Sequence, residues 1–117
     1  MGGWDLEAYA QDEKITDGDI PWIPIEEDSW TLGINGLRFA QAADTIPIKA
    51  SQLSLDTGLS YIMAPTEDIE HMATALKKQG VKCKPDPTGS SLDMYTCKCS
   101  SEALADMKPL EFQFSSG

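Results

Sequence analysis

The sequence predicts a mainly β fold with one α-helix. Short stretches of alternating apolar and polar residues are separated by turn signals, which is typical of strands. One stretch, residues 66–79, instead has its apolar residues at helical spacing. The chain shows no internal repeat and no linker, and its 117 residues suit one compact domain or part of a larger one.

The first half of the chain is expected to form an edge strand and a hairpin. Residues 20–25 contain two prolines, which fit an edge strand and exclude a central one. Asn35-Gly36 is a strong tight-turn signal between two alternating stretches, 30–34 and 37–39, so these are predicted to pair as a hairpin. A loop over 40–45 and an extended stretch over 46–48 follow.

The second half of the chain contains the predicted helix. Two extended segments, 51–55 and 59–64, surround an Asp-Thr-Gly triplet. The helix then begins with Thr66 as N-cap and ends at Gly80. Its first turn is acidic, with Glu67 and Asp68. One face is apolar and consists of Ile69, Met72, Ala73 and Leu76. The remaining expected elements are a loop over 84–92 and strands over 94–99 and 110–114.

The charge balance excludes some partners. Nine Lys and Arg stand against 19 Asp and Glu, a net charge of −10. Such a surface repels nucleic acid and anionic membranes, so neither is an expected partner. The chain has no apolar run of membrane-spanning length, and its start lacks the features of a signal peptide. The chain is therefore expected to be cytosolic, or a piece of a longer, exported protein.

Three cysteines lie close together in the last third of the chain: Cys83, Cys97 and Cys99. Their spacing is not a usual zinc pattern, and the only histidine, His71, is distant on the predicted helix, so no metal site is expected. A disulfide from Cys83 to Cys97 or Cys99 is the simpler interpretation, with the odd cysteine paired outside this chain. Three free thiols are the alternative.

The triplet Asp56-Thr57-Gly58 is the main candidate for chemistry. Aspartate is disfavoured in strands, so an aspartate between two apolar extended segments requires a reason. The alternative is an ordinary turn in which Asp56 and Thr57 bond the local backbone. On the triplet and its flanking segments alone, the two interpretations stay open.

The order of the motifs along the chain resembles the pepsin, renin and cathepsin D family of aspartic proteases, from the segment entering the C-terminal lobe onward. The motifs are Gly2-Gly3-Trp4-Asp5, Ile20-Pro21-Trp22-Ile23-Pro24-Ile25, Trp30-Thr31-Leu32-Gly33-Ile34, Leu53-Ser54-Leu55-Asp56-Thr57-Gly58-Leu59-Ser60-Tyr61 and Pro65. The resemblance implies that residues 1–117 are a partial C-terminal lobe of the bilobal acid-protease fold. Residues 1–19 would be its entry segment and residues 20–117 its β-rich part, with the catalytic loop at 56–58.

The resemblance also implies a role for the residues of the loop. Asp56 would be the catalytic aspartate, Thr57 and Gly58 would support it, and Leu59 and Ser60 would contact substrate. Two aspartates, one from each lobe, share a proton in this family, so that one activates water and the other polarises the peptide carbonyl. No cofactor is implied. The expected partners are the N-terminal lobe and a peptide or protein substrate, in a secreted, lysosomal or vacuolar setting.

Leu59 departs from the family pattern, in which a Thr or Ser hydroxyl usually bonds the aspartate. Three hypotheses therefore remain: half of an aspartic endopeptidase, inactive without the other lobe; a non-catalytic binding or structural subunit; or a self-dimerising retroviral-type protease. The third is disfavoured because no hydrophobic-hydrophobic-Gly segment follows the helix.

Outside the loop, His71 is expected to be solvated, the Trp22 and Trp30 side chains to pack in the core or at its edge, and Glu26-Glu27-Asp28 to form a solvated turn.

Overall fold

The structure is a computed structural model that describes residues 16, 18, 22–25, 29–86 and 94–115. Within these residues the chain forms five strands and two helices, so the class is mainly β, as predicted. The elements in chain order are β1 (Thr31–Phe39), β2 (Gln52–Ser54), α2 (Thr66–Lys78), β3 (Lys82–Asp86), β4 (Met94–Lys98), α3 (Ser101–Asp106) and β5 (Leu110–Phe114). Strand β5 has the predicted bounds, and β4 ends one residue earlier than predicted.

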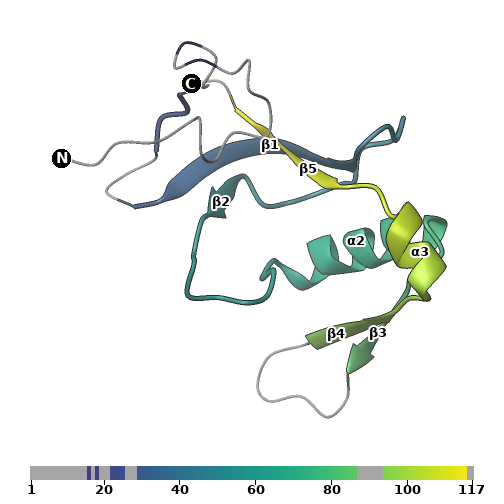
Figure 1. Ribbon diagram of the computed structural model, residues 1–117. Helices are drawn as coiled ribbons and strands as arrows, with labels where there is room; N and C mark the ends of the chain where they lie inside the picture. Colours follow the sequence, from purple (N-terminus) through teal and green to yellow (C-terminus); the bar gives the residue numbers. More distant parts are fainter. Residues whose placement is uncertain (1–15, 17, 19–21, 26–28, 87–93, 116–117) are drawn as a thin grey trace.

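A three-stranded antiparallel sheet has the order β2-β1-β5, with β1 at its centre (Figure 1). The predicted hairpin over residues 30–39 is wrong, because β1 runs through Asn35-Gly36 without turning back. Instead, the register between β1 and β5 is irregular at these residues, between Ile34 and Gly36. A Cβ added at Gly36 would lie 2.8 Å from the Gln113 side-chain oxygen, so a larger residue here would require the exposed Gln113 side chain to move.

The irregularity changes which side chains of β1 are buried. Leu32 and Ile34 are buried before it, and Leu37 and Phe39 after it. A regular strand alternates faces with a period of two, and one extra residue shifts that alternation. The Asn35-Gly36 turn signal that suggested two strands therefore lies at an irregularity within one strand.

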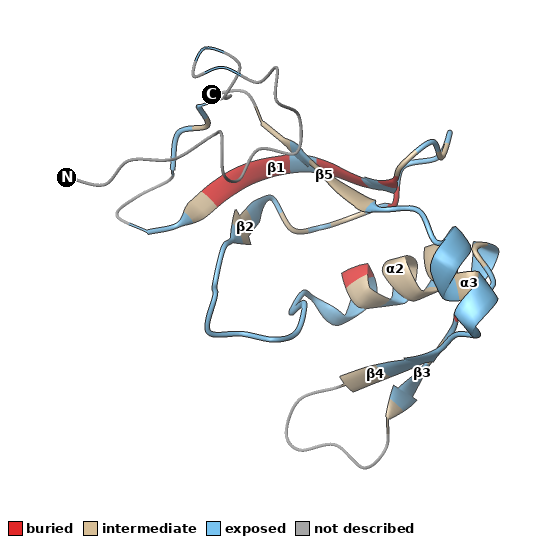
Figure 2. Cartoon of the chain, in the orientation of Figure 1, coloured by how far each residue is buried: buried red, intermediate tan, exposed pale blue. Residues whose placement is uncertain are grey.

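Helix α2 covers the main apolar cluster of the described residues. Leu37, Phe39 and Ile46 form that cluster, and Met72, Ala75 and Leu76 of α2 pack against it. Figure 2 shows the buried positions concentrated along β1. Two expected contributors, Ile69 and Ala73, are only partly buried and lie outside this cluster.

The two ends of α2 differ from each other in how they are capped. Pro65, and not Thr66, occupies the N-cap, and no side chain caps the helix there. At the other end Gly80 has a φ of 81°, and its N–H donates to the Lys77 carbonyl. The N–H of the buried Val81 donates to the Leu76 carbonyl, which completes a Schellman motif. Gly80 therefore ends the helix, as predicted.

A two-stranded antiparallel sheet, β3 with β4, lies on the other side of α2 from the three-stranded sheet (Figure 1). Residues 84–86, predicted as part of a loop, belong to β3. The rest of that predicted loop, 87–92, lies outside the described residues. Cys83 and Cys97 are directly opposite each other in this pair and are joined by a disulfide.

Helix α3 was not predicted. It has six residues, which is too short for a helical periodicity to show in the sequence. Ser100 is its N-cap, and the Ser100 hydroxyl oxygen accepts a hydrogen bond from the Ala103 N–H at 3.1 Å. Glu102 lies in the first turn, and hydrogen bonds from its own backbone and from the Ser100 hydroxyl lower its pKa. Ser100 as a possible N-cap and Glu102 after it were the only features of the sequence that indicated this helix.

Two predicted extended segments are not strands. Residues 22–25 of the expected edge strand lie outside any sheet, and residues 20–21 are not described. Residues 59–64 are also non-regular and exposed. Trp22 and Trp30 were expected to pack in the core or at its edge, and the structure excludes the core, since these residues are 75% and 72% exposed. The expected turn at 26–28, the entry segment over residues 1–15 and the motif at residues 2–5 lie outside the described residues.

Candidate active site

The Asp-Thr-Gly triplet lies directly beyond strand β2. This strand pairs with the start of β1, and the pairing is extended by a hydrogen bond of 2.8 Å from the Leu55 N–H to the Trp30 carbonyl. Asp56 is therefore the first residue after the last contact with the sheet. From there the chain passes in a long exposed loop to α2, as Figure 2 shows. The sheet thus fixes where the triplet begins, while its side chains face solvent.

The Asp56 carboxylate is held by its own turn. Its Oδ1 accepts a hydrogen bond of 2.8 Å from the Gly58 N–H, and the Leu59 N–H lies 3.4 Å from the Asp56 carbonyl oxygen. A Cβ added at Gly58 would lie 3.2 Å from the same Oδ1, tighter than most such contacts. Glycine at this position therefore lets the backbone approach the carboxylate. This is the local turn that the sequence left open as an alternative, and it leaves the carboxylate exposed.

The other predicted site residues of the loop are close to Asp56 in sequence and equally exposed. Thr57, Gly58, Leu59 and Ser60 are all exposed. The structure thus brings the five predicted loop residues together in a single surface turn.

Apolar side chains surround this turn without being covered. Leu55 is 52% exposed and Leu59 40%. Farther along the same loop, three more large side chains are between 57% and 69% exposed: Tyr61, Ile62 and Met63. The loop thus carries five exposed large apolar side chains close together in the sequence.

The cysteines lie away from this turn, in the β3–β4 pair (Figure 1). The disulfide joins Cys83 to Cys97, one of the two pairings predicted. Cys99, just after β4, is free and exposed. The alternative of three free thiols is therefore wrong. In the described part of the chain, no three His, Cys, Asp or Glu side chains are grouped so that they could hold a metal ion.

A second aspartate, Asp68, holds the segment that leads into β2, and the sequence analysis did not predict this role. Asp68 is 1% exposed, and its two carboxylate oxygens accept hydrogen bonds from the Lys49 N–H at 2.7 Å and the Ala50 N–H at 3.0 Å. These residues lie just before β2, so Asp68 connects α2 to the strand that leads to Asp56. An ion pair between the Lys49 ammonium and the Glu67 carboxylate joins the same two segments and raises the Lys49 pKa.

A helical pattern could have indicated this residue. Asp68 precedes Met72 by four positions and Ala75 by seven, so all three lie on one side of α2. Met72 and Ala75 pack against the apolar cluster. An acid on the buried side of a helix must have hydrogen-bond partners, and here the backbone provides them.

The comparison with protein families decides which group the chain belongs to. The family model of the eukaryotic aspartyl proteases matches residues 9–117, nearly the whole chain. The chain belongs to the eukaryotic aspartyl protease family. Comparison with curated proteins and with solved structures finds no match.

Membership of the aspartyl protease family places the chain among proteins with a protease-related function. The small sheets and two helices of the described residues are consistent with part of a pepsin-like lobe. The disulfide is compatible with an oxidising, extracellular setting. None of the described helices is long and apolar enough to cross a membrane.

Two further expectations, about the single residues His71 and Thr66, are wrong. His71 is partly buried instead of solvated, and its Nδ1–H donates a hydrogen bond of 3.0 Å to the Pro47 carbonyl. Thr66 is the first residue of α2 and not its cap.

Proposed function

We propose that this chain is one half of an aspartic endopeptidase and that Asp56 is its catalytic aspartate. In this mechanism Asp56 and an aspartate from the N-terminal lobe share one proton. The ionised carboxylate takes a proton from water, which attacks the peptide carbonyl, while the protonated carboxyl polarises that carbonyl. Because the mechanism needs two carboxyl groups, the chain alone is inactive.

The observation that supports this proposal best is the position of Asp56. Its carboxylate is exposed at the end of a strand, in a turn closed by the Gly58 N–H. A carboxylate at a lobe surface can meet a second carboxylate from a facing lobe, whereas a buried one cannot. The sequence has one Asp-Thr-Gly and no Asp-Ser-Gly, so the second aspartate of such a pair would come from another lobe.

The exposed apolar side chains of the same loop support the need for a partner. Leu55 and Leu59 flank the triplet in the sequence, and Tyr61 follows them; all three are exposed. Covering these side chains with a facing lobe would remove apolar surface from water, which is favourable. It would also exclude water from the pair of aspartates, where electrostatic interactions are then stronger. The proposed partners are therefore the N-terminal lobe and a peptide or protein substrate, and the proposed setting is secreted, lysosomal or vacuolar.

One observation favours a second candidate, a protease-like subunit that binds other proteins without catalysis. Leu59 occupies the position after the triplet where a hydroxyl is usual in the pepsin-like pattern, and it gives Asp56 no side-chain hydrogen bond. A hydroxyl at this position would supply a donor that Leu59 cannot. An apolar side chain here suits a contact surface at least as well as a catalytic loop.

The test compares the chain alone with the same chain joined to the N-terminal lobe and to the later C-terminal strands that the pepsin-like fold implies. Cleavage of an unfolded protein is measured across acid and neutral pH. The chain alone should show none, and the supplemented protein should cleave at acid pH and be blocked by a statine peptide, which mimics the transition state. Replacing Asp56→Asn should lower kcat by at least about a thousandfold, because one of the two carboxyl groups is lost.

Asp44→Asn is the matched control, since Asp44 is exposed and distant in sequence from the loop, and cleavage should be unchanged. A folded, supplemented protein that does not cleave at any pH would favour the binding subunit. Cleavage by the chain alone that disappears with Asp56→Asn would favour a self-dimer.

A further inference from the structure

The connection between β2 and α2 is the longest continuously exposed segment of the described chain. Every residue over 54–67 is exposed, and residues 55–65 belong to no helix or strand. Figure 2 shows this connection in the colour of exposed residues on its way from β2 to α2. The exposure extends well beyond the turn at Asp56, so the part of the connection after that turn requires its own explanation.

The backbone of residues 60–64 makes no hydrogen bond in the described structure. Before this segment, the Leu59 N–H lies 3.4 Å from the Asp56 carbonyl oxygen. After it, the Pro65 carbonyl accepts a hydrogen bond from the Ile69 N–H in the first turn of α2. The segment between them can therefore be drawn into an extended conformation without breaking a hydrogen bond. Proteolytic nicking favours exposed backbone of this kind.

The side chains of this segment are of the kind that endopeptidases take into apolar pockets. Tyr61, Ile62 and Met63 follow one another, and each is more than half exposed. Binding sites for apolar side chains are concave and mostly apolar, so three such side chains on accessible backbone can enter one directly. Segment 60–64 therefore combines an accessible backbone with side chains that a protease recognises.

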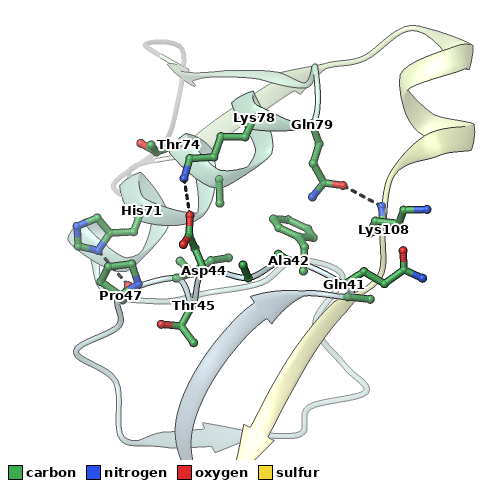
Figure 3. A pocket seen from close by; sticks show the side chains of 15 residues that line it. Gln41, Ala42, Asp44, Thr45, Pro47, His71, Thr74, Lys78, Gln79 and Lys108 are labelled. Atoms are coloured by element: carbon green, nitrogen blue, oxygen red, sulfur yellow. Dashed lines mark hydrogen bonds and ion pairs between the residues drawn. The ribbon is translucent and has the colours of Figure 1, made fainter.

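The rest of the structure would hold the two pieces of the chain together after a cut in this segment. Strand β1 lies before the segment and β5 after it, and these two strands pair with each other. Helix α2 packs against the apolar cluster formed by β1 and the residues that follow β1. Figure 3 shows the His71 side chain bonded to the Pro47 carbonyl at 3.0 Å. It also shows the Lys78 ammonium, which lies 3.4 Å from the Asp44 carboxylate.

We propose that segment 60–64 is a site of limited proteolysis by an endopeptidase that recognises large apolar side chains. Water hydrolyses the Tyr61–Ile62 peptide bond, so that Tyr61 gains a free carboxylate and Ile62 a free amino group, and no other reactant is consumed. The product is a chain in two pieces, 1–61 and 62–117, that remain associated. Asp56 then lies near a new chain end and is no longer connected covalently to α2.

The cut would depend on whether a second lobe covers the loop, and this part of the inference rests on the proposed function. A facing lobe that covers Leu59 and Tyr61 also keeps an endopeptidase away from the neighbouring peptide bond. Proteolysis would then act on halves without a partner and spare assembled ones. The cut in the chain alone requires only the exposure and the free backbone of segment 60–64.

Thermolysin, which cleaves before large apolar residues, is the probe for the 117-residue chain, and mass spectrometry locates the cuts. Cleavage before Ile62 or Met63 should be at least about tenfold faster than cleavage before Leu104. Leu104 is 58% exposed and Ile62 57%, but the Leu104 N–H donates to the Ser100 carbonyl at 3.0 Å, so α3 must open first. Equal rates at the two places, or no cut within 60–64, overturns the proposal.

Substituting Ile62→Asn and Met63→Gln together tests the recognition of the side chains. These substitutions remove the apolar groups and break no hydrogen bond, so thermolysin cleavage within 60–64 should slow by at least about tenfold. Leu104→Gln, at an equally exposed position outside the segment, is the matched control and should leave cleavage within 60–64 unchanged. Cleavage of the double variant at the rate of the parent chain overturns the recognition of apolar side chains.

Gel filtration of the cut chain tests whether its pieces stay together. Pieces 1–61 and 62–117 should elute together in native buffer and separately in urea, because only the fold then holds them. Separate elution in native buffer overturns the associated two-piece product.

The chain joined to the N-terminal lobe and the later C-terminal strands separates this inference from the proposed function. Thermolysin should cut segment 60–64 at least about tenfold more slowly in the joined protein than in the chain alone, because the lobe covers it. A joined protein that hydrolyses peptides but is cut as fast as the chain alone overturns the dependence on the lobe and leaves the proposed function intact. A joined protein that is inactive, while the chain alone is cut within 60–64, counts against the proposed function only.

Discussion

Two aspartates at neighbouring points of the chain have opposite environments. Asp56 is exposed and accepts a hydrogen bond from the Gly58 N–H within its own turn. Asp68 is buried and accepts from two backbone N–H groups, those of Lys49 and Ala50. The first carboxylate is thus free to meet another molecule. The second connects a helix to the strand that leads to the first, so we interpret it as a positioning residue.

Replacing the buried aspartate should be costly. In Asp68→Ala the Lys49 and Ala50 N–H groups lose their partners, which should lower the free energy of unfolding by about 2–4 kcal/mol. Urea unfolding followed by circular dichroism measures this change. Asp106→Ala at the exposed end of α3 is the control and should change stability by less than about 0.5 kcal/mol. Equal effects of the two substitutions would show that the Asp68 hydrogen bonds do not hold the segments together.

The sequence showed one of these aspartates and not the role of the other, for physical reasons. Asp56 belongs to a triplet between two apolar segments, which is a local pattern. The hydrogen-bond partners of Asp68 are 18 and 19 residues away along the chain. An acid in the first turn of a helix is expected from the helix dipole alone, and only the alignment of Asp68 with Met72 and Ala75 on one side of α2 indicated that this one is buried. The same limit applied to His71, whose partner is Pro47.

Among the elements, those set by local chemistry were predictable and those set by neighbours were not. Helix α2 has an apolar face and a glycine stop, and the structure confirms both. Strand β1 contains Asn35-Gly36, which favours a turn in isolation. Its two neighbours in the sheet hold it extended, and the register with β5 shifts at this point, between Ile34 and Gly36. Pairing with β5, more than 70 residues later, could not be known from the local pattern.

The Cys83–Cys97 disulfide is the main stabilising interaction of the β3–β4 pair. The pair has no buried hydrophobic side chain, and Lys82 and Lys98 face each other across it, which is unfavourable. The disulfide joins residues 14 positions apart and limits the freedom of the unfolded chain. A loop of this length is worth about 3 kcal/mol in the chain-entropy model.

Removing the disulfide should therefore destabilise the chain. The double substitution Cys83→Ser and Cys97→Ser should lower the free energy of unfolding by about 2–3 kcal/mol, measured by urea unfolding. Cys99→Ser is the control and should have little effect, because Cys99 is free and exposed. Thiol titration should find one reactive thiol in the unreduced chain and three after reduction. Three thiols before reduction would contradict the bond and favour a cytosolic protein.

At the scale of the whole molecule, burial and exposure are unevenly distributed. The buried side chains gather along β1 and beneath α2, while the loop between β2 and α2 carries a series of uncovered apolar side chains (Figure 2). Leu55, Tyr61 and Ile62 are each more than half exposed. A soluble domain rarely leaves such side chains grouped in one loop unless they meet a partner. The exposed aspartate and this apolar loop are thus two properties of the same surface.

This loop should make the chain associate with itself when no partner covers it. Light scattering coupled to gel filtration should show an apparent mass that rises with concentration, in spite of the repulsion from a net charge of −10. Substituting Ile62→Asn and Met63→Gln together removes two side chains that are 57% and 59% exposed. Association should then require a concentration at least about threefold higher, because less apolar area is buried on contact. Leu104→Gln on α3, which is 58% exposed but outside the loop, is the matched control and should leave association unchanged. If the control weakens association as much as the double substitution does, the surface around Asp56 is not the one that binds.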